Sequence, residues 1–289
     1  MLTRLSHSHV RIGTFQRLAF YGEVENMAAL VRYALVHLYG EPAGNDASEN
    51  ALRLFDLVSA ATARLAASYM AAGFVHGVLN SDNINVTGES FDYGPWRFTP
   101  FWEEDFTAAY FDHYGLYSFG RQAEAIHWDL AQFAGCMSLL TEAPPLADGL
   151  SQWSDRFEHE LVVALLRRLG VEATDRKADR DLADALVSSL RSREATIDRV
   201  LFDWRGGRHP GSERYGSPSF RELAAKLEGR ERQATHAYWS DAEPCSMHID
   251  EVEAIWSDIA DRDDWTVFEA KVEAIRRMGY AMKEDAPAA

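Results

Sequence analysis

Apolar residues recur at intervals of three and four through most of this chain, which is the spacing of amphipathic helices. The first such stretch spans residues 22–39 and the second spans residues 48–72. Gly73 follows the second stretch, as glycine commonly follows a helix C-terminus. We therefore predict two helices here, of which the second leads directly into the segment after Gly73.

The same spacing continues in the second half of the chain. It predicts helices over residues 121–141, 147–170, 178–191 and 196–204, and further helices within 217–280. Such a pattern favours a mainly α fold.

Signals for extended structure are confined to two places. Residues 1–21 read as an extended opening, because polar and apolar residues alternate from His9 to Ile12. Farther on, Ile84, Val86 and Phe91 flank a Thr-Gly-Glu-Ser turn as a short hairpin would. We therefore predict an α+β fold that is mainly α, with one short β-hairpin.

A polar, glycine-containing stretch at residues 206–216 is the best candidate for a linker. It divides the chain into a region 1–205 and a helical C-terminal region 217–289. Two adjacent glycines, Gly206 and Gly207, could suggest a phosphate-binding loop. The pattern Gly-x-x-x-x-Gly-Lys is missing, however, so we predict an ordinary loop.

Composition narrows the possible functions. The formal net charge is −16, which argues against a sequence-independent grip on nucleic acid, because such a grip needs a basic face. The two cysteines predict no disulfide framework. No apolar run approaches the length of a membrane span, and Met1 is not followed by a signal peptide. We expect a cytoplasmic protein without a membrane or nucleic-acid partner.

The chemistry-bearing residues gather in residues 73–86 and 91–95, which read Gly-Phe-Val-His-Gly-Val-Leu-Asn-Ser-Asp-Asn-Ile-Asn-Val and Phe-Asp-Tyr-Gly-Pro. Protein kinases place a His-Arg-Asp-x-x-x-x-Asn loop before an Asp-Phe-Gly segment to hold metal and phosphate. Counted from His76, the eighth position keeps the metal-binding Asn as Asn83, whereas Val78 replaces the base at the third. This pattern indicates a kinase-like site with a displaced carboxylate.

Residues 95–120 are rich in aromatic side chains interleaved with acids. One interpretation is a loop that packs by means of its own aromatics. The other is an acidic, aromatic surface that receives a protein substrate. Nucleic acid is disfavoured, because its binding surfaces combine aromatics with basic residues.

Together these motifs resemble the selenoprotein O family, also called the YdiU family. The resemblance extends upstream to Leu2-Thr3-Arg4 and 8–15, and downstream to 115–122 and 128–131. It implies a pseudokinase fold, of which this chain holds the C-lobe, and transfer of AMP from ATP to Ser, Thr or Tyr hydroxyls of proteins.

The resemblance also implies a role for each site residue. Asp82 would accept the proton of the target hydroxyl as the catalytic base. Arg4 and Arg11 would hold the ATP phosphates, a task that suits the guanidinium fork. Asn83 and Asp92 would bind Mg²⁺ or Mn²⁺ against those phosphates, and Asp92 thereby contributes to the nucleotide site.

One departure from the family concerns the N-lobe, with its glycine-rich segment, lysine and glutamate, which we do not find in this sequence. We therefore expect the chain alone to bind ATP weakly and to transfer AMP poorly. Two alternatives stay open. The chain could be a catalytically inactive kinase-like scaffold or binding protein, or a small-molecule phosphotransferase, against which Val78 at the usual base position argues.

Overall fold

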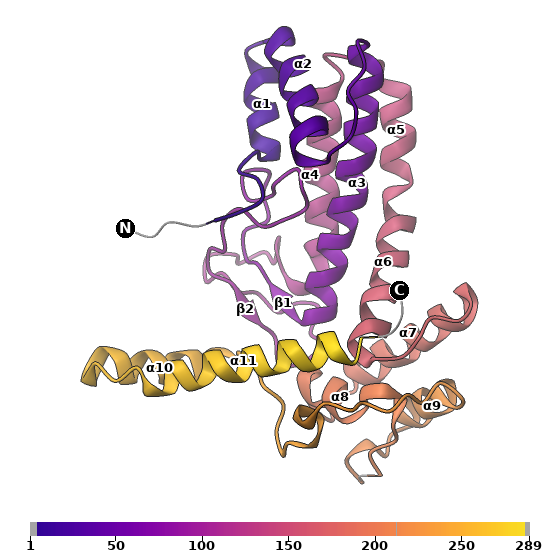
Figure 1. The fold of residues 1–289 in the computed structure, drawn as a ribbon, viewed down its shortest axis with the longest axis vertical. Helices are drawn as coiled ribbons and strands as arrows, with labels where there is room; N and C mark the ends of the chain where they lie inside the picture. Colours follow the sequence, from indigo (N-terminus) through magenta and orange to yellow (C-terminus); the bar gives the residue numbers. More distant parts are fainter. Residues whose placement is uncertain (1–4, 212, 287–289) are drawn as a thin grey trace. The chain divides into compact units, whose positions relative to one another are not determined.

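The computed structural model describes residues 5–211 and 213–286, and these are mostly helical (Figure 1). Contacts group them into two compact units. The first comprises the chain up to Met70 together with Val75–Trp96 and Asp105–Leu161. The second comprises Ala71–Phe74, Arg97–Glu104 and the chain from Val162 onwards. The prediction of a mainly α fold is confirmed, while a kinase-like C-lobe stays a prediction.

Helices form the first unit, and α4 contacts both α1 and α5 (Figure 1). Its core is aromatic: the Phe15 and Phe133 rings meet edge to face at 5.0 Å, and Phe55 stacks on Phe133 at 6.2 Å. Burial of such rings supplies much of the hydrophobic stabilisation. The helices are α1 (Ile12–Phe20), α2 (Val24–Tyr33) with a π-helical continuation (Ala34–Leu38), α3 (Ala47–Ala72), α4 (Gln122–Met137), α5 (Ala143–Ser151) and α6 (Trp153–Leu169).

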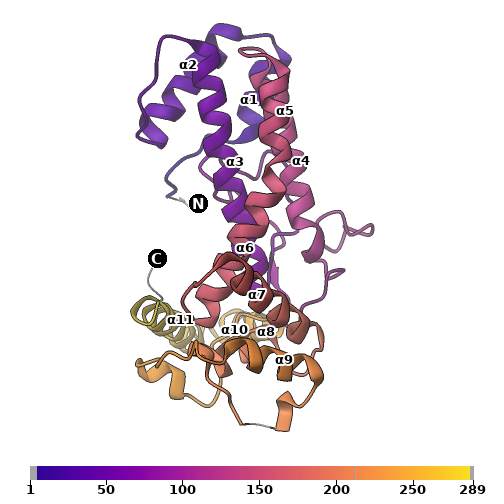
Figure 2. The same ribbon diagram turned by 90° about the vertical axis from the view of Figure 1, so that its right-hand side faces the viewer.

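The two longest of these helices cross the division between the units. Ala71 and Ala72 of α3 and residues 162–169 of α6 belong to the second unit. Besides helices and the loops between them, the second unit holds Phe74 of β1 (Phe74–Val75) and β2 (Arg97–Phe98), and these two strands pair with each other. In it α7 packs on α9, as Figure 2 shows. The helices are α7 (Arg176–Arg191), α8 (Ile197–Asp203), α9 (Pro218–Leu227), α10 (Ile249–Arg262) and α11 (Thr266–Glu284).

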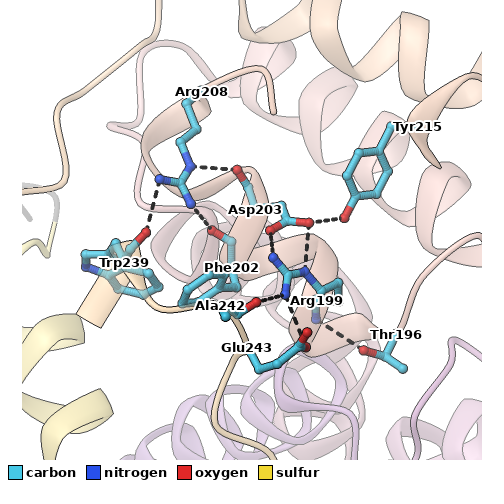
Figure 3. A network of polar contacts seen from close by, with 9 residues as sticks. All are labelled: Thr196, Arg199, Phe202, Asp203, Arg208, Tyr215, Trp239, Ala242 and Glu243. Carbon is cyan, nitrogen blue, oxygen red and sulfur yellow. Dashed lines mark hydrogen bonds and ion pairs between the residues drawn. The ribbon is translucent and has the colours of Figure 1, made fainter. Parts of the chain in front are cut away.

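A polar network at the end of α8 holds the second unit together (Figure 3). The buried carboxylate of Asp203 accepts hydrogen bonds from Arg199 Nε at 2.9 Å and from the Tyr215 hydroxyl at 2.5 Å. Burial acts to raise the pKa of Asp203, but these bonds outweigh it and lower the pKa. Arg199 also donates to the carbonyl of Ala242 at 2.7 Å, so the network joins α8 to the segments before α9 and α10.

The opening of the chain is less extended than its alternation predicted. Residues 12–20 form α1, so the prediction of extended structure over 1–21 was wrong there. Ile12 and Phe15 lie three positions apart and are both fully buried, which is helical spacing. Val10 and Arg11 do pair with the hairpin region, through the bond from Val86 N to Val10 O and the bridge between Arg11 and Asn85.

The predicted linker at residues 206–216 lies inside the second unit. Arg205, Gly206 and Gly207 form a short 3-10 helix and are buried. The proposed division at this stretch stays a prediction. In the described part of the chain, no helix is both long enough and apolar enough to cross a bilayer.

Candidate functional site

The candidate site begins where α3 ends. Gly73 adopts a φ of 66°, which lets the chain turn out of the helix into β1. His76 follows and is fully buried. Its backbone N–H donates to Gln122 Oε1 at 3.0 Å, and its Nδ1 accepts from the N–H of Val78 at 3.3 Å. His76 therefore braces the loop.

A tight turn presents Asp82 and Asn83. Asn80 closes this turn, because its side chain accepts from Asp82 N at 3.0 Å and its carbonyl accepts from Asn83 N at 2.8 Å. The amide nitrogen of Asn83 donates to the carbonyl of Val78 at 2.9 Å. That bond leaves the amide oxygen of Asn83 as the atom able to bind a cation.

The predicted hairpin is present, and it links Asn83 to Asp92. The N–H of Phe91 donates to the carbonyl of Asn83 at 2.9 Å, and Ile84 and Ser90 form an antiparallel bridge. Asp92 is thus the next residue after the partner of Asn83. Its side chain is exposed.

Arg11 lies beside Asp82. Its Nη1 is 3.6 Å from Asp82 Oδ1 and donates to the Asp82 carbonyl at 3.2 Å, while its guanidinium carbon lies 4.4 Å from the Phe91 ring centroid. The Asp82 side chain is 66% exposed, so this ion pair is a weak tether and the carboxylate stays accessible. Arg4, the other predicted phosphate ligand, lies outside the described residues.

Gly13 lets Asp82 approach α1 closely. A Cβ atom built on Gly13 would lie 2.2 Å from Asp82 Oδ1, and the Gly13 N–H donates to the Ser81 carbonyl at 2.9 Å. No local sequence pattern could reveal this contact, because Gly13 and Asp82 lie far apart in the chain.

The donor set suits a hard divalent cation only in part. Mg²⁺ prefers oxygen ligands such as the amide oxygen of Asn83 and the carboxylate of Asp92. Phosphate oxygens and water would have to supply the rest of its coordination shell. Among the described residues no group of three or more His, Cys, Asp or Glu could hold a metal by itself. The residues therefore fit a metal that arrives together with a nucleotide.

An open groove of about 700 Å³ lies next to the hairpin in the first unit. Its polar lining includes a hydrogen bond between His7 Nδ1 and Glu89 Oε1 at 2.7 Å. Sequence patterns did not indicate it, because its walls come from three separate segments. They are Leu5, Ser6, His7, Leu65, Ser68, Tyr69, Gly88, Glu89, Ser90 and Tyr93.

Comparison with known proteins supports the motif assignment. Residues 1–213 match the sequence model of the family described as protein adenylyltransferase SelO. This is more than half of the chain, and the chain therefore belongs to that family.

Several curated relatives share the name protein nucleotidyltransferase YdiU. The protein of Synechocystis is 36% identical over 189 residues, covering 65% of this chain and 40% of that protein. The protein of Nitrobacter winogradskyi is 36% identical over 201 residues, or 66% of this chain and 38% of the relative. The protein of Gloeobacter violaceus is 31% identical over 296 residues, which cover 96% of this chain and 61% of that protein. The chain thus spans about two-fifths of the length of the first two relatives.

Proposed function

We propose that this chain carries the metal- and base-bearing part of a protein adenylyltransferase site and transfers AMP from ATP to Ser, Thr or Tyr hydroxyls of proteins. Family membership supports the reaction class. The observation that supports the assignment to residues is the hairpin bond between Asn83 and Phe91, the residue before Asp92, together with the exposed Asp82 carboxylate beside Arg11.

The proposed reaction is a displacement at the α-phosphorus. The target hydroxyl oxygen forms the new P–O bond, the bond from the α-phosphorus to the α,β-bridging oxygen breaks, and pyrophosphate leaves. Asp82 accepts the hydroxyl proton, since its carboxylate is exposed and free to approach an incoming side chain. Arg11 reaches the same carboxylate, and in the complex its guanidinium would shift to phosphate oxygens. A bound Mg²⁺ or Mn²⁺, held by Asn83 and Asp92, would offset phosphate charge.

We expect the 289-residue chain by itself to bind ATP weakly and to transfer AMP slowly. Most of the rate gain in such transfers comes from positioning and charge stabilisation. The glycine-rich segment and lysine that the family resemblance implies are not among these residues. The expected activity is therefore low but dependent on Asp82 and Asp92.

Labelled nucleotide tests the proposal. The chain is incubated with Mg²⁺ or Mn²⁺ and a bacterial protein extract, in parallel with α-labelled and γ-labelled ATP, and labelled proteins are resolved on a gel. Label from the α position that falls to background in Asp82→Asn and Asp92→Asn supports AMP transfer. Label only from the γ position would favour a phosphotransferase. Wild-type labelling no greater than that of both variants would favour a catalytically inactive scaffold.

A further inference from the structure

A group of exposed apolar side chains lies on the loop that precedes α4. We call Tyr110, Phe111, Tyr114 and Leu116 the aromatic platform. Tyr110 is 88% exposed and Tyr114 is 94% exposed, while Phe111 and Leu116 are each about half exposed. Trp102 and Phe119, which lie before and after the platform in the same aromatic-rich region, are buried. The fold therefore covers part of this region but leaves the platform exposed.

The loop that carries the platform is tied by its own hydrogen bonds. The Asp112 carboxylate accepts from the N–H groups of Leu116 and Tyr117, both at 2.8 Å. The N–H of Gly115 donates to the Asp112 carbonyl at 3.2 Å, and that of Ser118 donates to the Gly115 carbonyl at 3.2 Å. A surface held in this way loses little conformational entropy when a partner binds.

Both ends of this loop are fixed to the residues that open the candidate site. At the start, a Cβ on Gly77 would lie 3.2 Å from Ala108 Cβ and 3.5 Å from Ala109 N, so the two segments are in close contact. At the end, Gln122 Oε1 accepts from His76 N. Tyr110 directly follows the first contact. The platform thus adjoins the loop that leads to Asp82.

We propose that the aromatic platform binds the segment of the protein substrate that flanks the modified hydroxyl, and that it selects apolar side chains accompanied by basic ones. This inference rests on the proposed function. Exposed aromatic residues on an ordered surface are the usual anchors of protein interfaces. The same segment carries the exposed Asp105 and the partly buried Asp112, and the net charge of the chain is −16, so a basic partner is favoured.

The same charge disfavours other occupants. An anionic lipid surface attracts basic segments and repels acidic ones. A second copy of this chain would bring two acidic faces together. Arg121 follows the platform and could attract an acidic partner. Its Nε, however, already donates to Glu124 at 2.9 Å, so its charge is paired within the chain.

Peptide binding tests the platform without requiring catalysis. The probe is a fluorescent peptide with the core Lys-Leu-Ser-Phe-Lys, and two matched peptides replace either both lysines by glutamate or both apolar residues by alanine. Fluorescence anisotropy measures Kd for the full chain, for Tyr110→Ala/Tyr114→Ala, and for the control Phe20→Ala, which removes an 82% exposed aromatic from the end of α1. All three aromatic side chains are exposed, so the variants are expected to fold like the wild type.

We expect the probe to bind at least about tenfold more tightly than either matched peptide, and the double variant to weaken probe binding by about tenfold or more, with no change in Phe20→Ala. Equal binding of all three peptides, or unaltered binding by the double variant, would overturn the inference. So would a wild-type dimer in sedimentation that the double variant converts to monomer. Peptide binding and α-label transfer are measured separately. A failure of the platform inference can therefore be told apart from a failure of the proposed function.

Discussion

The backbone N–H of His76 donates a 3.0 Å hydrogen bond to the side-chain oxygen of Gln122, the first residue of α4. Both residues are fully buried. Gln122 ends the segment 115–122, which contributes to the family resemblance but suggests no chemical role for this residue. Its position shows that it holds the backbone of the candidate loop and is not placed to contact a substrate.

Replacing Gln122 by Met should therefore destabilise the protein. Met has a similar volume but no strong acceptor, so the buried N–H of His76 would lose its partner. Loss of such a partner costs about 1–3 kcal/mol. Urea unfolding of the wild type and of Gln122→Met measures the change. A variant as stable as the wild type would show that the bond contributes little.

Gly13 offers a test that separates activity from stability. In Gly13→Ala the new methyl group would displace the Asp82 carboxylate, whose Oδ1 lies 2.2 Å from the position of the added Cβ. The helix itself should gain up to about 1 kcal/mol, because alanine is the better helix former. We expect lower α-label transfer with equal or greater stability in urea. Gly135→Ala is the matched control, since Gly135 also lies within a helix, and no heavy atom of the described residues beyond the adjoining helix backbone comes within 4 Å of the added Cβ. Transfer that falls equally in both variants would contradict this account of Gly13.

Asp129 makes stability depend on pH. It is fully buried, neither carboxylate oxygen has a hydrogen-bond partner among the described residues, and burial raises its pKa to about 8. The nearby Tyr117 also has a raised pKa, through burial and then through Asp129 and Asp112.

The folded protein thus keeps the Asp129 proton to a higher pH than the unfolded chain, whose aspartates titrate near pH 4. The stabilising effect of this proton is fully present below about pH 4 and is lost as pH rises towards 8. Asp129→Asn should remove this loss, so that its free energy of unfolding exceeds that of the wild type by a few kcal/mol near pH 8. Urea titrations at several pH values check this. Asp155→Asn, at an exposed site on α6, should lose stability with rising pH as the wild type does. If the free energy of unfolding of Asp129→Asn also falls with pH as in the wild type, Asp129 is not the group responsible.

Arg205 should be a major contributor to the stability of the second unit. It is only 2% exposed, and burial lowers its pKa to about 10. Its guanidinium donates to the carbonyls of Arg167 at 2.9 Å and Arg168 at 3.0 Å, at the end of α6, and to that of Asp285 at 2.6 Å. It also lies 4.6 Å from the Trp239 ring centroid.

We expect Arg205→Lys to lower the free energy of unfolding by about 2 kcal/mol or more, because an ammonium group cannot reproduce the planar fork that reaches three carbonyls. Thermal and urea unfolding measure the loss. Arg221→Lys, on exposed α9 surface, is the control and should change stability by less than about 0.5 kcal/mol. Equal stability of the two variants would show that the fork is not needed.

The sequence by itself was sufficient to predict most helices and the short hairpin. Their signals are local: the spacing of three and four along α3 and α7, and the turn between Ile84 and Phe91, lie within a few residues of one another. It was also sufficient to single out Asp82, Asn83 and Asp92, because a kinase-like motif is a matter of order and spacing. The opening helix α1 was missed, since alternation at His9–Ile12 masked the helical spacing of Ile12 and Phe15.

Only the tertiary structure could show what those residues contact. The bond from His76 to Gln122, the approach of Gly13 to Asp82 and the burial of Asp129 each join or enclose residues far apart in the chain. Such contacts depend on how several helices pack at once, and no short window of sequence contains that information. The sequence therefore supplied the candidate site residues, whose roles stay predictions, whereas the contacts that support them and the exposed platform were decided by packing.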